Sequence, residues 1–307
     1  MSLYSDSLVY CCHPLVYICD RSNKRIAVVD IADEKQTMQI SCGEDSDPYG
    51  IAMSPNSSCA YVANYISKTI QKLDLTHENK MDTKKLSHSP KALAVSPCGS
   101  FLYVVFDTNP VLLVMDAHTL EEVSSISLPA PASSVTVVPN GRTAYLTLPS
   151  LDQTAAVDLQ SHAVIHLLKS GSSPNHIVSA RTVPTVLEAG QESDSLILID
   201  TYNNVAKEEV RLDSAPSGIA FINGEQHCLI SLKNENKAAV VDLYSKKVTS
   251  RIPVGSLPGS VAASKAYPLA VVCNEGDSTL SIINTNTAAV TATVTIGGTA
   301  AGAVMVG

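Results

Sequence analysis

The sequence predicts an all-β fold, a seven-bladed β-propeller with four antiparallel strands in each blade. Two markers carry this prediction, and both recur every 42 residues in the same phase. The first marker departs from this spacing only once, with a first step of 44 residues. Self-similarity at a fixed period is the signature of a repeat architecture. An apolar run ends at Asp30, Asp74, Asp116, Asp158, Asp200, Asp242 and Asn284, and a proline or alanine recurs at Pro48, Pro90, Ala132, Pro174, Pro216, Pro258 and Ala300.

One repeat unit resolves into four short strands. In the unit that follows Pro48, the pattern predicts strands over Ile51–Ser54, Ala60–Asn64, Thr69–Leu75 and Lys84–Ser87, with turn residues between them. Four short strands separated by turns fit a propeller blade. A helical solenoid would instead need stripes of 3.6-residue period over ten or more residues, which no unit contains.

The repeats fill the chain and predict a single domain over residues 1–307. Two terminal segments compete to complete the ring. Ser7–Tyr10 is an inner-strand candidate of the first unit, and Ala303–Val306 falls where the inner strand of a further unit would begin. We expect one of them to join the first and last blades, since closure removes exposed strand edges.

The second strands carry a recognisable motif. Tyr61-Val62-Ala63-Asn64 follows Ser54-Pro55-Asn56 and differs at one residue from the Tyr-Val-Thr-Asn signature of the YVTN-repeat propeller family, which the chain resembles. Tyr103-Val104-Val105 and Tyr145-Leu146-Thr147 repeat the arrangement. The resemblance is thin in the fifth unit, where Leu187 replaces the tyrosine.

This resemblance implies a seven-bladed propeller but leaves the activity open. Relatives of the YVTN type include surface-layer and binding proteins, lactonase-like enzymes and a streptogramin lyase. The chain has no Trp, which argues against the Trp-Asp repeat class and against quinoprotein propellers, whose blades dock on tryptophan. A fold of this kind does not by itself assign a function.

Composition excludes several classes of partner. The chain is 45% hydrophobic and 16% charged, enough for a buried core. Its formal charge of −8 disfavours nucleic acid and anionic membranes, and no apolar run is long enough for a membrane span. Eight cysteines without disulfide or metal-knuckle spacing suggest a reducing compartment. We therefore expect a cytoplasmic protein, or a secreted one if a signal peptide has been removed.

The recurring aspartates suggest a ring of carboxylates, but a structural role explains them better. Each ends the third strand of its unit just before a hairpin turn. At such positions the Asp carboxylate accepts hydrogen bonds from backbone N–H groups two or three residues later. We therefore expect turns here, and we place the functional positions elsewhere in the repeat.

The binding residues are expected at one mouth of the central axis. There the connections between blades meet the connections between second and third strands, and variable loops on a rigid scaffold carry function. The predicted ring is polar and asymmetric, which suits a small ligand or a short peptide better than a structural plug; a plain water-filled channel is the alternative. Its members are Tyr49, Lys91, Ser133, Asn175, His176 and Ser217, together with Asp20, Arg21, Asn64, Tyr65, Asp107, Lys233, Asn274 and Glu275 at the second-strand ends.

His176 is the candidate for acid–base chemistry at this mouth. A general acid–base needs a carboxylate within hydrogen-bond reach, which Asp20, Asp107 or Glu275 would supply. His88 approaches the same face, so a histidine-lined metal site is a further alternative, although we predict no metal and no cofactor. No phosphate-binding loop, nucleophile elbow or zinc motif occurs.

The primary functional prediction is a recognition module that binds a small ligand or a protein partner at its mouth. The first alternative is a lactonase-like or lyase-like enzyme that uses His176 and a carboxylate in the same pocket. The second is an interaction repeat without pocket chemistry, in which the blade sides or the lower face make the contacts. Sequence alone leaves all three open.

Overall fold

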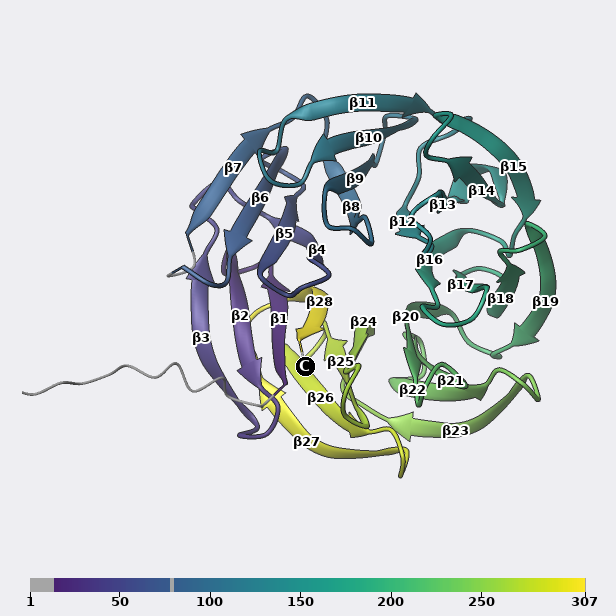
Figure 1. The fold of residues 1–307 in the computed structure, drawn as a ribbon. Coiled ribbons are helices and arrows are strands. Elements are labelled where there is room, and N and C mark those ends of the chain that lie inside the picture. Colours follow the sequence, from purple (N-terminus) through teal and green to yellow (C-terminus); the bar gives the residue numbers. More distant parts are fainter. Residues whose placement is uncertain (1–13, 78–79, 307) are drawn as a thin grey trace, which may run out of the picture.

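The computed structural model describes residues 14–77 and 80–306 as a closed ring of seven four-stranded antiparallel sheets (Figure 1). The predicted seven-bladed propeller is therefore confirmed. The only helical segment in the described ranges is the 3-10 turn η1 (Pro149–Leu151). No helix there is long and apolar enough to cross a membrane.

Each blade runs from an innermost strand at the axis to an outermost strand at the rim. The first blade contains β28 (Ala300–Val306), β1 (Leu15–Asp20), β2 (Arg25–Asp30) and β3 (Lys35–Ser41); the next two contain β4 (Pro48–Met53), β5 (Cys59–Asn64), β6 (Thr69–Asp74), β7 (Met81–Lys85), β8 (Pro90–Val95), β9 (Phe101–Phe106), β10 (Val111–Asp116) and β11 (Glu122–Ser127). The fourth and fifth contain β12 (Ser134–Val137), β13 (Thr143–Leu148), β14 (Gln153–Asp158), β15 (Ala163–Lys169), β16 (Pro174–Ser179), β17 (Thr185–Gly190), β18 (Ser195–Asp200) and β19 (Val205–Arg211). The last two contain β20 (Pro216–Ile222), β21 (His227–Leu232), β22 (Lys237–Asp242), β23 (Lys247–Pro253), β24 (Pro258–Ala263), β25 (Leu269–Asn274), β26 (Thr279–Asn284) and β27 (Ala289–Thr295).

The C-terminal strand closes the ring. β28 pairs antiparallel with β1, with Leu15 opposite Val306 and Asp20 opposite Ala300. It thereby becomes the innermost strand of a blade whose other three strands come from the start of the chain (Figure 1). The inner-strand role considered for Ala303–Val306 is confirmed, whereas its rival Ser7–Tyr10 lies outside the described residues.

The two middle strands lie where the sequence predicts them, and the inner and outer strands begin earlier. β5 and β6 match the predicted strands closely, whereas β4 begins at Pro48, before the predicted Ile51–Ser54, and β7 begins at Met81, before the predicted Lys84–Ser87. Beyond Lys85 the chain has left the ladder, and Leu86 N donates to Lys68 O at 2.8 Å. An outer strand is mostly solvent-exposed, so it lacks the apolar alternation that locates a strand in sequence.

The hydrophobic core lies between neighbouring blades. Side chains of a strand alternate between the two faces of the sheet. The blades on either side of it cover both of these faces. In one such layer, Val16 and Ile18 of β1 pack with Val271 and Cys273 of β25. Small aliphatic side chains therefore fill the space between the blades.

The repeated aspartates close hairpin turns, as expected. Asp116 Oδ1 accepts the N–H groups of His118 at 2.9 Å and Thr119 at 2.8 Å. These hydrogen bonds, first that from Thr119, lower the pKa of Asp116. The same pattern occurs at Asp30, Asp74, Asp158, Asp200, Asp242 and Asn284.

The tyrosine of the family motif joins adjacent blades. Tyr61 is buried, and its Oη donates to the carbonyl oxygen of Ala117 in the β10–β11 turn of the next blade at 2.8 Å. Tyr145 Oη donates in the same way to Asn204 in the β18–β19 turn. A buried tyrosine needs such a partner for its hydroxyl, and here the partner belongs to the neighbouring sheet.

We expect Tyr61→Phe to lower the free energy of unfolding by about 1 kcal/mol, the net value of one buried hydrogen bond plus the cost of an unpaired carbonyl. Urea denaturation measures this difference. Tyr103→Phe is the matched control, since Tyr103 occupies the same repeat position and its hydroxyl has no hydrogen bond recorded within the described residues. Equal losses in the two variants would contradict the role of the tyrosine as an inter-blade clasp.

Candidate functional site: the axial mouth

The inner strands of the seven blades surround the central axis (Figure 1). Side chains at this axis enclose a cavity of about 560 Å³. Its wall comes from corresponding positions of successive repeats, as the 42-residue phase predicts. Of the predicted binding residues, those that line this cavity are Arg21, Tyr49, Lys91, Ser133, Asn175, His176, Ser217, Lys233 and Glu275.

Two further predicted residues stand directly behind the lining. Tyr65 Oη donates to Asp107 Oδ2 at 2.8 Å, and Lys91 Nζ donates to Asp107 Oδ1 at 2.8 Å. The Lys91 ammonium, followed by the Tyr65 hydroxyl, lowers the pKa of Asp107. Asp107 therefore holds Lys91 of the mouth and Tyr65 behind it in place as an ionised carboxylate.

Asp20, Asn64 and Asn274 lie off the cavity, although they were included in the predicted ring. All three are fully buried at the ends of second strands. Asn64 Nδ2 donates to Gln71 Oε1 at 2.9 Å, and Asn274 Nδ2 donates to Ser281 Oγ at 2.9 Å. Because side chains alternate along a strand, these residues point between blades, whereas Arg21 and Glu275, one position after Asp20 and Asn274, line the cavity.

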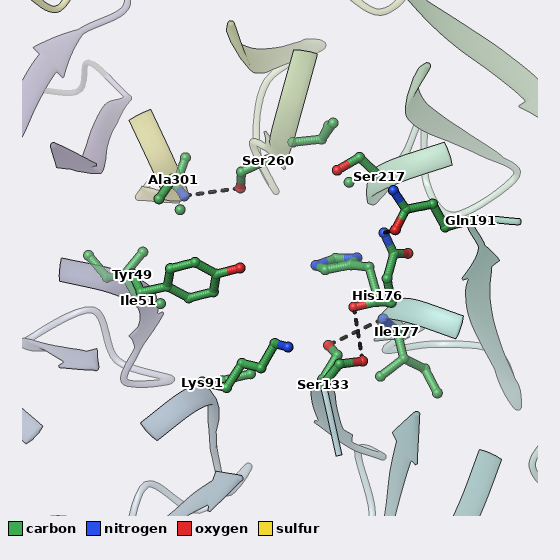
Figure 2. A pocket seen from close by; sticks show the side chains of 18 of the residues that line it. Tyr49, Ile51, Lys91, Ser133, His176, Ile177, Gln191, Ser217, Ser260 and Ala301 are labelled. Atoms are coloured by element: carbon green, nitrogen blue, oxygen red, sulfur yellow. Dashed lines mark hydrogen bonds between the residues drawn. The ribbon is translucent and has the colours of Figure 1, made fainter. Parts of the chain in front are cut away.

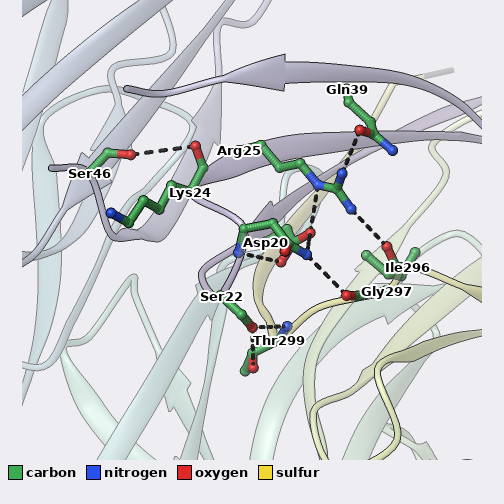
Figure 3. A network of polar contacts seen from close by, with 10 residues as sticks. Asp20, Ser22, Lys24, Arg25, Gln39, Ser46, Ile296, Gly297 and Thr299 are labelled. Atoms are coloured by element: carbon green, nitrogen blue, oxygen red, sulfur yellow. Dashed lines mark hydrogen bonds and ion pairs between the residues drawn. The ribbon is translucent and has the colours of Figure 1, made fainter. Parts of the chain in front are cut away.

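Asp20 shows what such a buried position does. Its Oδ2 accepts hydrogen bonds from Arg25 Nε and Asn23 Nδ2, both at 2.8 Å (Figure 3). Arg25 Nη2 continues to Ile296 O at 3.2 Å, and Asn23 Nδ2 continues to Gly297 O at 3.0 Å. The network ties the first blade to the segment that leads into β28, so Asp20 supports ring closure.

Tyr49 is held rigidly with its hydroxyl towards the axis (Figure 2). The Arg21 guanidinium lies 5.1 Å from the centre of its ring, and Tyr65 packs beside it with 6.1 Å between ring centres. Arg21 is itself fixed by a two-fold contact with Asp47, at 2.8 and 2.9 Å. Cation–π and bidentate contacts of this kind fix orientation as well as adding stability.

The cations of the mouth are all neutralised within the protein. Arg21 pairs with Asp47, Lys91 pairs with Asp107 at 2.8 Å, and Lys233 pairs with Glu275 at 3.2 Å. The mouth therefore presents little net charge. Its groups without an internal partner are neutral hydroxyl, amide and imidazole groups.

A ring of small residues lies one position further along each inner strand, and His176 interrupts it. The corresponding residues are Gly50, Ala92, Ser134, Gly218, Ser260 and Gly302. Small side chains are needed because neighbouring strands approach closely here. A Cβ on Gly218 would lie 2.5 Å from Gly259 O, and one on Gly302 would lie 2.9 Å from Tyr49 O. His176 therefore projects alone from this level of the wall towards Tyr49 and Lys91 (Figure 2).

The His176 imidazole is neutral at physiological pH. Desolvation in the channel wall lowers its pKa to about 4, and its Nδ1 is buried without a hydrogen-bond partner. The carboxylates considered as its catalytic partners are engaged elsewhere, Asp20 with Arg25, Asp107 with Lys91, and Glu275 with Lys233. His176 thus projects a neutral imidazole into the cavity, and no described carboxylate contacts Nδ1 to activate it as a base.

His88 lies outside this lining. Its ring packs against Phe106 with 5.8 Å between centres, and its Nδ1 contacts Asn109 at 3.4 Å. Within residues 14–77 and 80–306 no three His, Cys, Asp or Glu side chains cluster as a metal site would require. The structure thus does not bring His88 and His176 together.

Sequence reasoning missed Gln191, which lines the cavity beside Asn175. Asn175 Nδ2 donates to Gln191 Oε1 at 3.3 Å, while Asn175 Oδ1 is buried without a partner. Gln191 occupies the repeat position of Asp107, Lys233 and Glu275. The 42-residue spacing was the signal that could have found it, but the fifth unit has the weakest motif.

The comparisons with known proteins agree with this architecture. A family model described as YncE-like β-propeller matches residues 8–306. No curated protein gives a significant match. Several solved structures share the fold: a functionally unknown protein from Desulfotomaculum acetoxidans (15% identity, TM-score 0.79, 95% of this chain and 98% of that chain), Kuenenia stuttgartiensis hydrazine synthase (18%, 0.70, 78% and 77%) and the RRP9 WD40 repeats (13%, 0.75, 85% and 84%).

Identities this low carry the fold alone and no activity. The family match is of another kind, since it spans the ring from the first blade to the closing strand. It also fits the YVTN-type motifs, whose tyrosines join the blades. The chain belongs to the YncE-like β-propeller family.

Proposed function

We propose that this propeller is a recognition module whose axial mouth binds a small, neutral, hydrogen-bonding molecule. The observation that carries the proposal is a pair of polar atoms in the cavity wall. Asn175 Oδ1 and His176 Nδ1 are both buried and have no partner in the protein. Buried polar groups are otherwise almost always hydrogen-bonded, so a rotation of these two side chains towards a ligand in the cavity would supply the missing partners.

The dimensions and charge of the mouth support this ligand class. A cavity of about 560 Å³ is in the range of small-molecule sites. An anionic ligand would have to compete with Asp47, Asp107 and Glu275 for the cations, whereas a polyol, saccharide or amide meets groups that are free. A peptide that inserts a polar side chain would meet the same groups.

The enzymatic alternative receives no comparable support. Acid–base catalysis by His176 needs a partner that orients and polarises the ring. The three candidate carboxylates bind cations instead, and a histidine with a pKa of about 4 is a weak base. We therefore propose binding without turnover. A reducing compartment such as the cytoplasm suits the six described cysteines, all of which are free.

The proposal is tested by thermal shift with neutral sugars, polyols and amino-acid amides against matched phosphates and carboxylates. A ligand at a hundred times its Kd stabilises the protein by about 2.7 kcal/mol. We expect His176→Ala to weaken a neutral hit about tenfold, since one buried hydrogen bond is lost. Alanine is tolerated here because Ala92 occupies the same repeat position.

His88→Ala is the matched control, since His88 lies outside the cavity, and it is expected to bind as the wild type does. Tyr49→Phe should weaken binding about fivefold through loss of one hydroxyl. Binding of anions only, or equal loss in the two histidine variants, would contradict the proposal. Turnover of a bound lactone that depends on His176 would favour the enzymatic alternative instead.

A further inference from the structure

A second cavity, of about 520 Å³, lies between the fifth and sixth blades. Its wall comes from the turns β16–β17, β20–β21 and β22–β23, through Val183, Glu225 and Tyr244. In an antiparallel meander these turns lie at the opposite end of the strands from the connections that form the mouth. The second cavity is therefore on the other face of the propeller and independent of the proposed mouth function.

Two carboxylates without a lysine or arginine partner line this cavity. Glu225 accepts the N–H groups of Arg181 at 2.6 Å and Thr182 at 2.8 Å. Asp242 accepts those of Tyr244 at 2.9 Å and Ser245 at 2.6 Å. Among the described residues, neither carboxylate forms an ion pair with a lysine or arginine side chain.

Both carboxylates are ionised at neutral pH. Hydrogen bonds, first that from Ser245 N, lower the pKa of Asp242. At Glu225, burial by itself would raise the pKa. The hydrogen bonds from Thr182 and Arg181 and the nearby Arg181 charge outweigh burial, so the pKa of Glu225 is also lowered. His227 Nε2 lies 3.5 Å from Asp242 Oδ2, and its Nδ1 is buried without a partner. The cavity thus holds two negative charges beside one imidazole.

The rest of the wall is partly apolar and carries exposed aromatic surface. Val183, Leu198 and Leu243 are its apolar members, and the polar Thr185 and Gln226 complete the lining. Tyr244 is 95% exposed at the rim, and Tyr202 is 84% exposed at the equivalent turn of the neighbouring blade. No other blade has an aromatic ring of this size at that repeat position, where the residues are Ala32, Thr76, His118, Gln160 and Asn286. Tyrosine is enriched at protein interfaces and binds cations through its ring.

We propose that this cavity docks an arginine side chain from a flexible segment of a partner protein. The guanidinium would sit between Glu225 and Asp242, and its methylene stem would cover Val183, Leu198 and Leu243. Arginine suits the site better than lysine because its planar fork can donate to two carboxylates at once and stack on tyrosine. The net charge of −8 favours a basic partner further.

The test uses fluorescence anisotropy with the full chain and a labelled (Gly-Ser-Arg)₄ peptide, beside its lysine and glutamine counterparts. We expect binding that weakens with salt and follows the order arginine, lysine, glutamine. Asp242→Asn should weaken the arginine peptide about tenfold through loss of a charge-assisted contact. Its fold is preserved because Asn284 closes the equivalent turn with hydrogen bonds of 3.0 and 3.2 Å.

Asp116→Asn is the matched control, since Asp116 closes the same turn in a blade remote from the cavity. Tyr244→Ser should weaken binding about threefold through loss of the aromatic contact, while Asp116→Asn and His176→Ala leave it unchanged. The proposal is overturned if the glutamine peptide binds equally well, if the wild type fails to bind at millimolar peptide, or if Asp116→Asn loses as much as Asp242→Asn.

Discussion

Deletion of residues 300–307 is expected to abolish cooperative folding of the propeller. The deletion removes β28, which covers the full length of β1 from Leu15 to Asp20. It also removes the buried Ala300 and Met305 from the layer between the first and last blades. A domain is stabilised by only about 5–15 kcal/mol, and loss of a closing strand would remove most of it. The β1 edge would then be open to other chains.

Circular dichroism should show the loss of a sharp unfolding transition. Size-exclusion chromatography should show association of the truncated chain into oligomers. A synthetic peptide of residues 297–307 is expected to restore the transition, since an extended segment can add to an exposed strand edge.

Met305→Asp should destabilise the full chain by several kcal/mol because it buries a charge, whereas Thr293→Asp, exposed on β27, should not. A truncated chain that stays monomeric with an unchanged midpoint would show that closure does not depend on β28.

The repeat allowed the fold to be predicted because it records a packing constraint in every blade. Two markers at 42-residue spacing are sufficient to count the blades, and the apolar second and third strands stand out since both of their faces are covered. The outer strands were harder to locate because only one face packs. β7 was misplaced for this reason, its residues being largely exposed.

The mouth could be predicted by repeat position but not to the exact residue. Asp20, Asn64 and Asn274 precede Arg21, Tyr65 and Glu275 by one position, and a one-residue step along a strand reverses the direction of the side chain. The ion pairs of the mouth could not be predicted from the sequence either. That Lys233 meets Glu275 from the next blade depends on how neighbouring blades pack.

Glu188 is a departure from the repeat whose meaning appears only in the structure. It lies fully buried on β17, at the position where the other blades bury Ile18, Val62, Val104, Leu146, Ile230 and Val272. Its carboxyl group accepts hydrogen bonds from the hydroxyls of Thr154 and Ser170. Burial is the larger influence and raises its pKa from 4.5 to about 7, in spite of the hydrogen bonds from Ser170 and Gly171.

This raised pKa makes the stability of the propeller depend on pH. Between about 4.5 and 7 the folded chain holds a proton on Glu188 that the unfolded chain has released, so the contribution of Glu188 to stability falls as pH rises. The change amounts to about 3 kcal/mol. His176 acts in the opposite direction, since its lowered pKa makes stability fall as pH drops from about 6.5 to 4. The two groups offset each other in the wild type.

Glu188→Gln is therefore expected to gain stability relative to the wild type at pH 8 and to lose that advantage at pH 5, by about 3 kcal/mol over the range. Urea unfolding at pH 5, 6, 7 and 8 measures the difference. Glu209→Gln, exposed on β19 of the same blade, should give a flat difference. In a His176→Ala background the chain should become more stable on mild acidification, because the opposing effect of His176 is removed. A flat Glu188→Gln difference would mean that the carboxyl group already ionises near its ordinary pKa, with water reaching it between the blades.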